Sequence, residues 1–124
     1  MVFNEDITAR ARANTYFREV LSTGPHCQVV VMSIPVGGEI GEEVHEGVDQ
    51  VLVCVEGEAF AVLEGERSPV LPGHLVHVPA GARHNLVNGG ATDLKLYTVY
   101  APPQHAVGTI HRTKAEADAS EEHY

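Results

Sequence analysis

Short apolar runs alternate with polar, glycine-containing segments along the middle of the chain. The runs are rich in valine and leucine, have the length of β-strands, and cover residues 27–34, 51–55, 59–63, 75–79 and 94–100. Between them a glycine recurs at every eighth position, at residues 57, 65, 73, 81 and 89. This turn spacing is typical of an antiparallel sandwich or barrel, so the pattern predicts an all-β chain with little helix.

Two flanking segments do not follow this pattern. Residues 8–20 fit either a short helix or an arm that pairs as an edge strand. Residues 113–122 are rich in alanine and glutamate, and Thr113 and Glu116 have the spacing of a capping box, which favours a short terminal helix. We therefore expect a barrel core at about residues 27–101, an N-terminal arm over 1–26 and a C-terminal tail over 102–124.

Length and charge restrict the possible functions. A chain of 124 residues with 44% hydrophobic content builds one domain around a single core. Its formal net charge of −9 repels phosphate backbones and anionic lipids, so neither nucleic acid nor a membrane surface is the expected partner. The sequence has no signal-peptide pattern and no apolar run near the ~18 residues of a spanning helix, which predicts a cytoplasmic protein.

The segment before the second apolar run combines acidic residues with a histidine. In an extended chain Glu43 and His45 point to the same face, because side chains alternate along a strand. A turn over residues 46–49 then brings in Gln50 at the start of the next strand. His84, from a later pair of strands, joins them and completes a set of two oxygen and two nitrogen donors.

Residues 73–88, GHLVHVPAGARHNLVN, carry a resemblance to the cupin superfamily. The second cupin motif, G-x5-P-x-G-x2-H-x3-N, is matched at every position by Gly73, Pro79, Gly81, His84 and Asn88. The first motif is matched in part: His45 occupies the second histidine position, Glu43 the first, and Gln50 stands where glutamate is usual. The resemblance covers about residues 34–100 and implies a single-domain jelly-roll barrel of six to eight strands with a metal inside its mouth.

The resemblance implies a divalent metal ion as cofactor, with Glu43, His45, Gln50 and His84 as ligands. This set carries one negative charge, as does the usual set of three histidines and one glutamate. Imidazole and carboxylate donors suit iron, manganese, nickel, cobalt or zinc. The alternative is a barrel that has lost its metal, with His45 and His84 hydrogen-bonded in a polar pocket.

Three further histidines are candidates for proton transfer. His77 alternates with Val76 and Val78 and faces away from their side of the sheet, which suits either an acid/base role or a surface position. His105 and His111 follow the Pro102-Pro103 pair, which stiffens the exit from the last strand. Their segment also resembles the closing segment of small cupins, so they either fold over the barrel mouth or lie in a solvated extension.

The leading functional hypothesis is a metal-dependent isomerase or lyase. Its substrate is a small oxygenated molecule, of a sugar-derived kind by analogy with small cupins that process unsaturated uronates. The metal polarises an oxygen of the substrate and an imidazole moves a proton. An iron-dependent dioxygenase and a non-catalytic ligand-binding barrel are the alternatives. A homodimer is expected, because small cupins usually pair.

Overall fold

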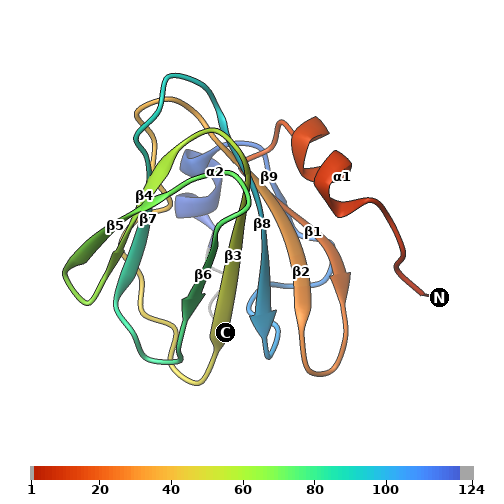
Figure 1. Ribbon diagram of the computed structural model, residues 1–124. Coiled ribbons are helices and arrows are strands. Elements are labelled where there is room, and N and C mark those ends of the chain that lie inside the picture. Colours follow the sequence, from red (N-terminus) through yellow and green to blue (C-terminus); the bar gives the residue numbers. More distant parts are fainter. Residues whose placement is uncertain (1, 121–124) are drawn as a thin grey trace.

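The chain folds into two antiparallel sheets that face each other (Figure 1). The computed structural model describes residues 2–120. Within this range six strands form the larger sheet, in the order β6-β3-β8-β2-β1-β9, and three form the smaller one, in the order β5-β4-β7. The strands are β1 (Arg18–Thr23), β2 (Gln28–Ile34), β3 (Asp49–Glu56), β4 (Ala59–Leu63), β5 (Glu66–Val70), β6 (Leu75–Val78), β7 (His84–Asn88), β8 (Leu94–Ala101) and β9 (Ile110–His111). The predicted all-β jelly-roll fold is confirmed.

The main core lies between the two sheets. Because side chains alternate along a strand, every second residue of the long strands points into the barrel. On β8 these inward residues are Leu94, Leu96, Thr98 and Tyr100, each at most 2% exposed. Leu94, Leu96 and Tyr100 belong to the main apolar cluster, while the Thr98 hydroxyl bonds Gln50 and the Tyr100 ring packs against His45 of the site described below.

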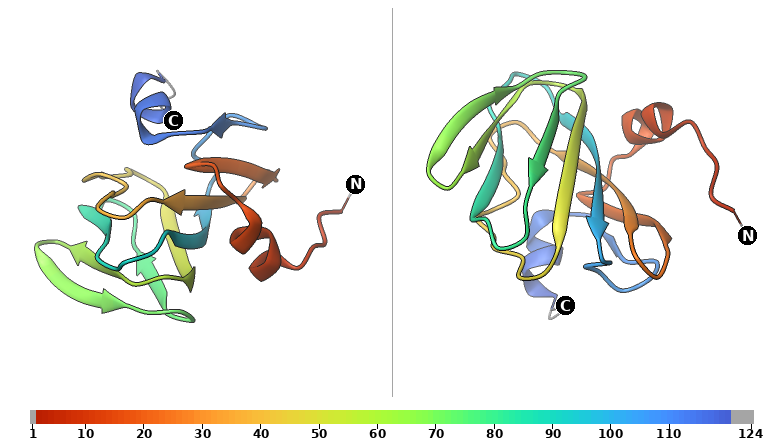
Figure 2. Two further views of the ribbon diagram at one scale, coloured as in Figure 1. Left: turned by 90° about the horizontal axis from the view of Figure 1, so that it is seen from above. Right: turned by 60° about the horizontal axis from the view of Figure 1, so that its bottom comes forward.

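Two short helices lie on opposite sides of the larger sheet (Figure 2). Helix α1 (Ile7–Ala13) begins at Asp6, whose carboxylate accepts a hydrogen bond from the Ala9 backbone at 3.1 Å. It covers the outer face of the sheet through Ala11, which packs with Val31 and Val55. Helix α2 (Lys114–Ala119) follows β9 on the cavity side. Neither helix, nor any other in the described part of the chain, is long and apolar enough to cross a membrane.

The flanking segments combine the alternatives that the sequence left open. Residues 8–20 hold most of helix α1 and the start of β1, and β1 is an inner strand that pairs with both β2 and β9. The predicted cap of the last helix is confirmed, because Thr113 Oγ1 accepts from the Glu116 backbone N–H at 3.1 Å. Residues 121 and 122 of that expected helix lie outside the described range.

Candidate metal centre

A sharp corner and a short backbone pairing place the site. Gly81 follows Pro79 with a φ of +84°, which glycine adopts without strain, and its N–H donates to the His45 carbonyl at 2.9 Å. Beyond the corner, Glu43 and His84 exchange both backbone hydrogen bonds, at 2.8 and 2.9 Å. Residues paired in this way project their side chains to the same side of the sheet. The register thus brings a carboxylate and an imidazole together.

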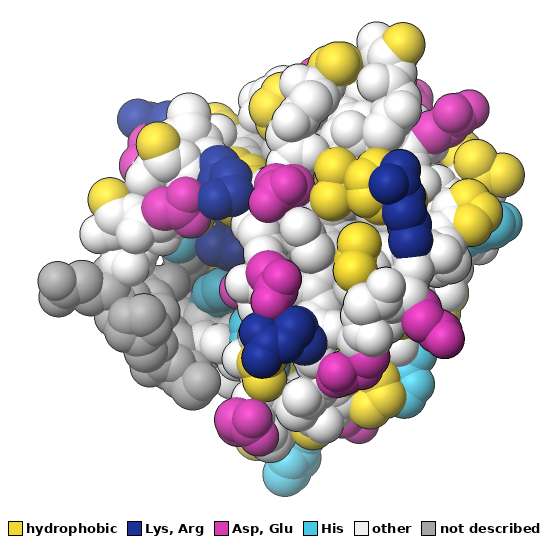
Figure 3. Space-filling model, turned by 90° about the vertical axis from the view of Figure 1, so that its left-hand side faces the viewer, with side chains coloured by type: hydrophobic (Ala, Val, Ile, Leu, Met, Phe, Trp, Pro, Cys, Tyr) yellow, Lys and Arg dark blue, Asp and Glu magenta, His cyan; other side chains and the backbone are white. Residues whose placement is uncertain are grey.

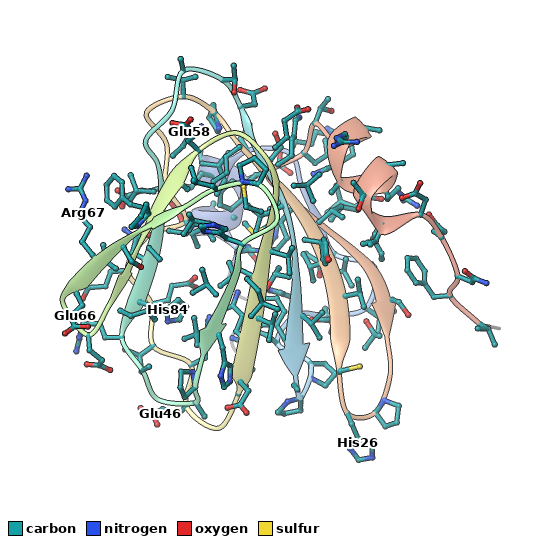
Figure 4. All side chains as sticks on the ribbon, viewed as in Figure 1. His26, Glu46, Glu58, Glu66, Arg67 and His84 are labelled. Atoms are coloured by element: carbon teal, nitrogen blue, oxygen red, sulfur yellow. The ribbon has the colours of Figure 1, made fainter. Side chains whose placement is uncertain are left out.

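Three of the four expected ligands form one compact cluster. Each of Glu43, His45 and His84 offers a donor atom, and the three atoms lie within 4.8 Å of one another. Glu43 Oε2 is 3.8 Å from His45 Nε2, and the two imidazole centroids are 5.2 Å apart. His84 lies on β7, while His26 is remote at the tip of the β1–β2 hairpin (Figure 4). The two imidazoles are buried, since His45 is 9% and His84 5% exposed, while the Glu43 side chain is 32% exposed.

The hydrogen bonding of His84 leaves its other nitrogen available to a metal. His84 Nδ1 is 3.0 Å from the Ala82 carbonyl oxygen, which can only accept, so Nδ1 carries a hydrogen and the lone pair of the neutral ring is on Nε2. The Nε2 atoms of His84 and His45 are buried and have no hydrogen-bond partner in the described structure. Buried nitrogens without partners cost stability, and a divalent cation would satisfy both.

Gln50 lies on the same inward side, at the start of β3. It is 1% exposed and pairs in register with Tyr100, whose ring centroid is 6.0 Å from that of His45. Its Nε2 donates to Thr98 Oγ1 at 3.0 Å, and this fixes the amide. Its Oε1 has no partner among the described residues. The fourth expected donor is therefore buried on the inner face of β3 opposite Tyr100, and its carbonyl oxygen has no partner in the described part of the chain.

The cluster opens into a cavity of about 600 Å³ lined mostly by polar side chains. Histidine side chains are visible in a hollow beside Lys and Arg side chains in Figure 3. His105 and His111 both line this cavity, as expected for residues folded over the barrel mouth. The ring of His105 packs edge-on against Tyr100 at 5.1 Å, and His111 is 8% exposed.

Burial dominates the electrostatics of the site. It raises the pKa of Glu43, a shift that the charge of Arg18 opposes. Burial also lowers the pKa of His45 to about 4, and neighbouring His84 and Arg18 add to this shift. His45 is therefore neutral at pH 7, the form that coordinates metal.

His77 does not belong to the site. The side chain is exposed and lies on the outer face of β6, paired with Val51, while the neighbouring Val78 is buried in the core. The alternation of the strand decides this, since the inward positions are taken by Val76 and Val78. The proposed acid/base role of His77 is wrong for this cavity.

Two residues that the sequence did not single out also belong to the site. Arg18 lines the cavity from β1 and is 6% exposed. Tyr100 lies between the rings of His45 and His105, and burial raises its pKa to about 12, so its hydroxyl stays protonated at neutral pH. The sequence held only a weak signal for Arg18. Arg18 and Val20 are alternate residues of one strand, and alternate residues point to the same face.

Comparison with known proteins gives three findings. The family model described as the cupin domain matches residues 30–100. YrkC, an uncharacterized protein of Bacillus subtilis (strain 168), is 40% identical over 126 aligned residues, which cover 97% of this chain and 68% of YrkC. The crystal structure of BH2720 from Bacillus halodurans is 40% identical, with a TM-score of 0.95 over 97% of this chain and 96% of that one.

A more distant structure shares the fold alone. KdgF from a Halomonas species is 24% identical, with a TM-score of 0.66 over 70% of this chain and 78% of KdgF. The match with BH2720 spans nearly the whole chain, so it includes the arm that carries Arg18 and the tail that carries His105 and His111. These flanking segments therefore lie within the shared architecture.

Proposed function

Because this chain belongs to the cupin domain family, we propose that it holds one divalent metal ion and acts on a small oxygenated molecule. Glu43, His45 and His84 would bind the ion, with the Gln50 carbonyl as an additional, weaker donor. The observation that carries the proposal is the convergence of three donor atoms within 4.8 Å, two of them buried imidazole nitrogens without another partner.

The donor set fits such an ion chemically. Two neutral imidazoles and one carboxylate suit iron, manganese, nickel, cobalt and zinc. The carboxylate, whose pKa burial raises, would gain a cation that favours its charged form. The hydrogen bond from His84 Nδ1 to a backbone carbonyl has the orienting role usually found behind metal-bound histidines.

The chain's own residues supply positioning and proton control. A bound divalent ion would act as a Lewis acid toward a carbonyl or hydroxyl oxygen. Tyr100 keeps its proton at neutral pH, and its buried hydroxyl hydrogen-bonds with Arg18 and Thr98, which helps to position Arg18 beside the cluster. Burial lowers the pKa of His105 to about 3, so His105 is neutral but a weak base. His111, at the cavity wall, is the remaining candidate for proton transfer in an isomerase or lyase reaction.

An iron-dependent dioxygenase is the second candidate function. The observation in its favour is the composition of the cluster, because two histidines and one carboxylate with open positions are the ligand set of non-haem iron oxygenases. Oxygen consumption by the iron-loaded protein separates the two reactions, since an isomerase or lyase consumes no oxygen.

Metal content tests the proposal before any substrate is chosen. Protein made without a histidine tag is loaded separately with each of the five ions, dialysed and analysed for bound metal. The wild type should retain about one equivalent of at least one ion, and Glu43→Gln and His84→Gln should retain little. Glu42→Gln and His77→Gln are matched controls on exposed residues and should behave as the wild type.

Two outcomes oppose the proposal. If the wild type retains no ion, the proposed metal site is rejected. If His84→Gln and His77→Gln retain equal amounts of metal, the ion binds somewhere other than the proposed site. Turnover is then examined in the loaded protein by proton NMR of aldoses, ketoses and unsaturated uronates. Specific binding without turnover of any of these supports the non-catalytic alternative.

A further inference from the structure

Arg18 is a buried cation that the metal cluster does not explain. Its side chain is 6% exposed, its Nη1 lies 3.2 Å from His111 Nδ1, and its guanidinium also hydrogen-bonds the Tyr100 hydroxyl. A guanidinium can only donate, so the imidazole nitrogen accepts and cannot neutralise the charge. The Nε–H of Arg18 is buried and has no partner in the described structure. Burying a charged group with an unused donor is unfavourable unless a ligand completes it.

The other basic side chains around the cavity already have carboxylate partners. Lys114 Nζ binds Asp118 at 2.7 Å, and Arg83, beside the rim, binds Glu42 at 2.7 Å. Among residues 2–120, no carboxylate oxygen lies within 4.0 Å of the Arg18 guanidinium. Arg18 therefore lines the cavity as a cation and has no acidic partner among residues 2–120.

The buried charges of the cavity favour an anion, because its other lining carboxylates, Glu42, Glu46 and Asp118, are exposed and two of them are paired with Arg83 and Lys114. A divalent ion on Glu43, His45 and His84 leaves one net positive charge, and Arg18 adds a second. Both lie in a partly enclosed space, where charges interact more strongly than in water. The influence of Arg18 reaches across this space, since its charge also shifts the pKa values of Tyr100 and His105.

We propose that Arg18, positioned by its hydrogen bond to His111, forms a carboxylate-binding subsite beside the Glu43, His45 and His84 cluster. The substrate is then a small carboxylic acid that carries a second oxygen group for the metal. This inference rests on the proposed function for the second oxygen group and for the charge of the metal ion. The unused Nε–H and the neighbouring amino group of Arg18 form a planar fork that matches the two oxygens of a carboxylate. A phosphate dianion fits less well, because Glu43, Glu46 and Asp118 also line the cavity.

Equilibrium binding of succinate, its uncharged analogue succinamide and inorganic phosphate tests the subsite. Calorimetry is run on the full chain, both zinc-loaded and metal-free, with metal content measured in the same samples. Succinate should bind at least about tenfold more tightly than succinamide and more tightly than phosphate. Arg18→Gln should lose at least about tenfold in succinate affinity, and Arg18→Lys, which keeps the charge but not the fork, should lose less. Arg83→Gln is the matched control and should not change the affinity.

The two proposals fail in different ways. If the protein takes up no metal but metal-free wild type still binds succinate through Arg18, the metal proposal fails and the subsite stands. If metal binds and Arg18→Gln leaves succinate affinity unchanged, the subsite is overturned. Succinamide or phosphate binding as tightly as succinate, or no succinate binding up to about 20 mM, also overturns it. These comparisons within the wild type remain decisive even if Arg18→Gln fails to fold.

Discussion

The inner face of the barrel changes character halfway along its strands. On β8, Leu94 and Leu96 are followed by Thr98 and Tyr100, and on β3, Gln50 precedes Leu52. We call the two ends the apolar half and the polar half. The apolar half contains Met32, Ile34, Leu52, Leu94 and Leu96, and the polar half contains Gln28, Gln50, His84, Thr98 and Tyr100.

The two halves are equally buried but differ in how well their atoms are satisfied. The residues of the apolar half are at most 4% exposed and belong to one continuous cluster. In the polar half, the buried atoms Gln50 Oε1 and His84 Nε2 have no partner among the described residues. Such atoms lower the free energy of unfolding. One half thus stabilises the fold, and the other retains the unsatisfied donors and acceptors that a ligand needs.

The apolar half should respond most strongly to truncation. Leu96→Ala removes a side chain that is fully buried between the sheets and leaves a cavity that rigid strands cannot close. We expect the free energy of unfolding to fall by about 3 kcal/mol in urea denaturation of the metal-free protein. Leu75→Ala, on a side chain that is 60% exposed, is the control and should change it by less than about 0.5 kcal/mol. Similar losses in both variants would show that Leu96 does not anchor the core.

Gln28 tests whether a buried polar residue with all its hydrogen bonds made stabilises the fold as the residues of the apolar half do. Its amide donates to Thr23 Oγ1 at 3.0 Å and to the His105 carbonyl at 2.7 Å. Its carbonyl oxygen accepts from the Gln104 and His105 backbone N–H groups at 3.2 and 2.9 Å. Gln28→Leu leaves these partners unpaired, so we expect a loss of about 2 kcal/mol in unfolding free energy.

Hydrogen exchange locates this effect on the chain. The segment around His105 is held to β2 by Gln28, so its amides should exchange faster in Gln28→Leu than in the wild type. Unchanged exchange at His105 would mean that other contacts hold this segment over the cavity.

His105, which packs against Tyr100 of the polar half, should make the free energy of unfolding depend on acid pH. Its pKa is lowered to about 3 in the folded protein, mainly by burial, against 6.5 for an ordinary histidine. Between these values the unfolded chain binds the proton and the folded chain does not, so the free energy of unfolding falls as the pH falls below about 6.5. The slope is at most about 1.4 kcal/mol per pH unit and is reduced by solvent screening.

The measurement compares urea denaturation of metal-free protein between about pH 7 and pH 5. His105→Asn should show a shallower slope than the wild type. Some slope should remain, because burial lowers the pKa of His45 to about 4 as well. His26→Asn, on an exposed hairpin tip, should keep the wild-type slope. Identical slopes in His105→Asn and the wild type would show that His105 is not held neutral by the fold.

The sequence predicted the strands whose residues alternate or form apolar runs. The second cupin motif identified Pro79 and Gly81, which form the corner before His84, because proline and glycine at fixed positions determine such a turn locally. The sequence did not identify β5, whose residues Glu66–Val70 are mostly exposed and carry no apolar pattern. It also did not identify β9, a two-residue strand defined only by its pairing with β1. The pairing of segments that are distant in sequence depends on the tertiary fold, so the local hydrophobic pattern cannot predict it.

The same limit applies to the site. Glu43, His45 and His84 were found because a motif and strand alternation both concern neighbouring residues. Arg18 reaches the cavity only through the order of strands in the larger sheet, which places β1 between β2 and β9. His77 was weighed by its own strand alone, and that alternation left open which face of the sheet would meet the cavity. Nearness in sequence predicted the cluster, and topology determined its surroundings.

Gln50 gives the smallest expected effect and tests whether satisfied and unsatisfied residues of the polar half differ. Gln28 and Gln50 are glutamines of equal burial, 0% and 1% exposed, so the same substitution can be made at both. Gln50→Leu loses the bond to Thr98 but also removes a buried oxygen without a partner. These effects oppose each other, so we expect the unfolding free energy of the metal-free protein to change by less than about 1 kcal/mol. A loss as large as that of Gln28→Leu would mean that Gln50 supports the fold as fully as Gln28 does, and its unpartnered oxygen would then not mark a position kept for a ligand.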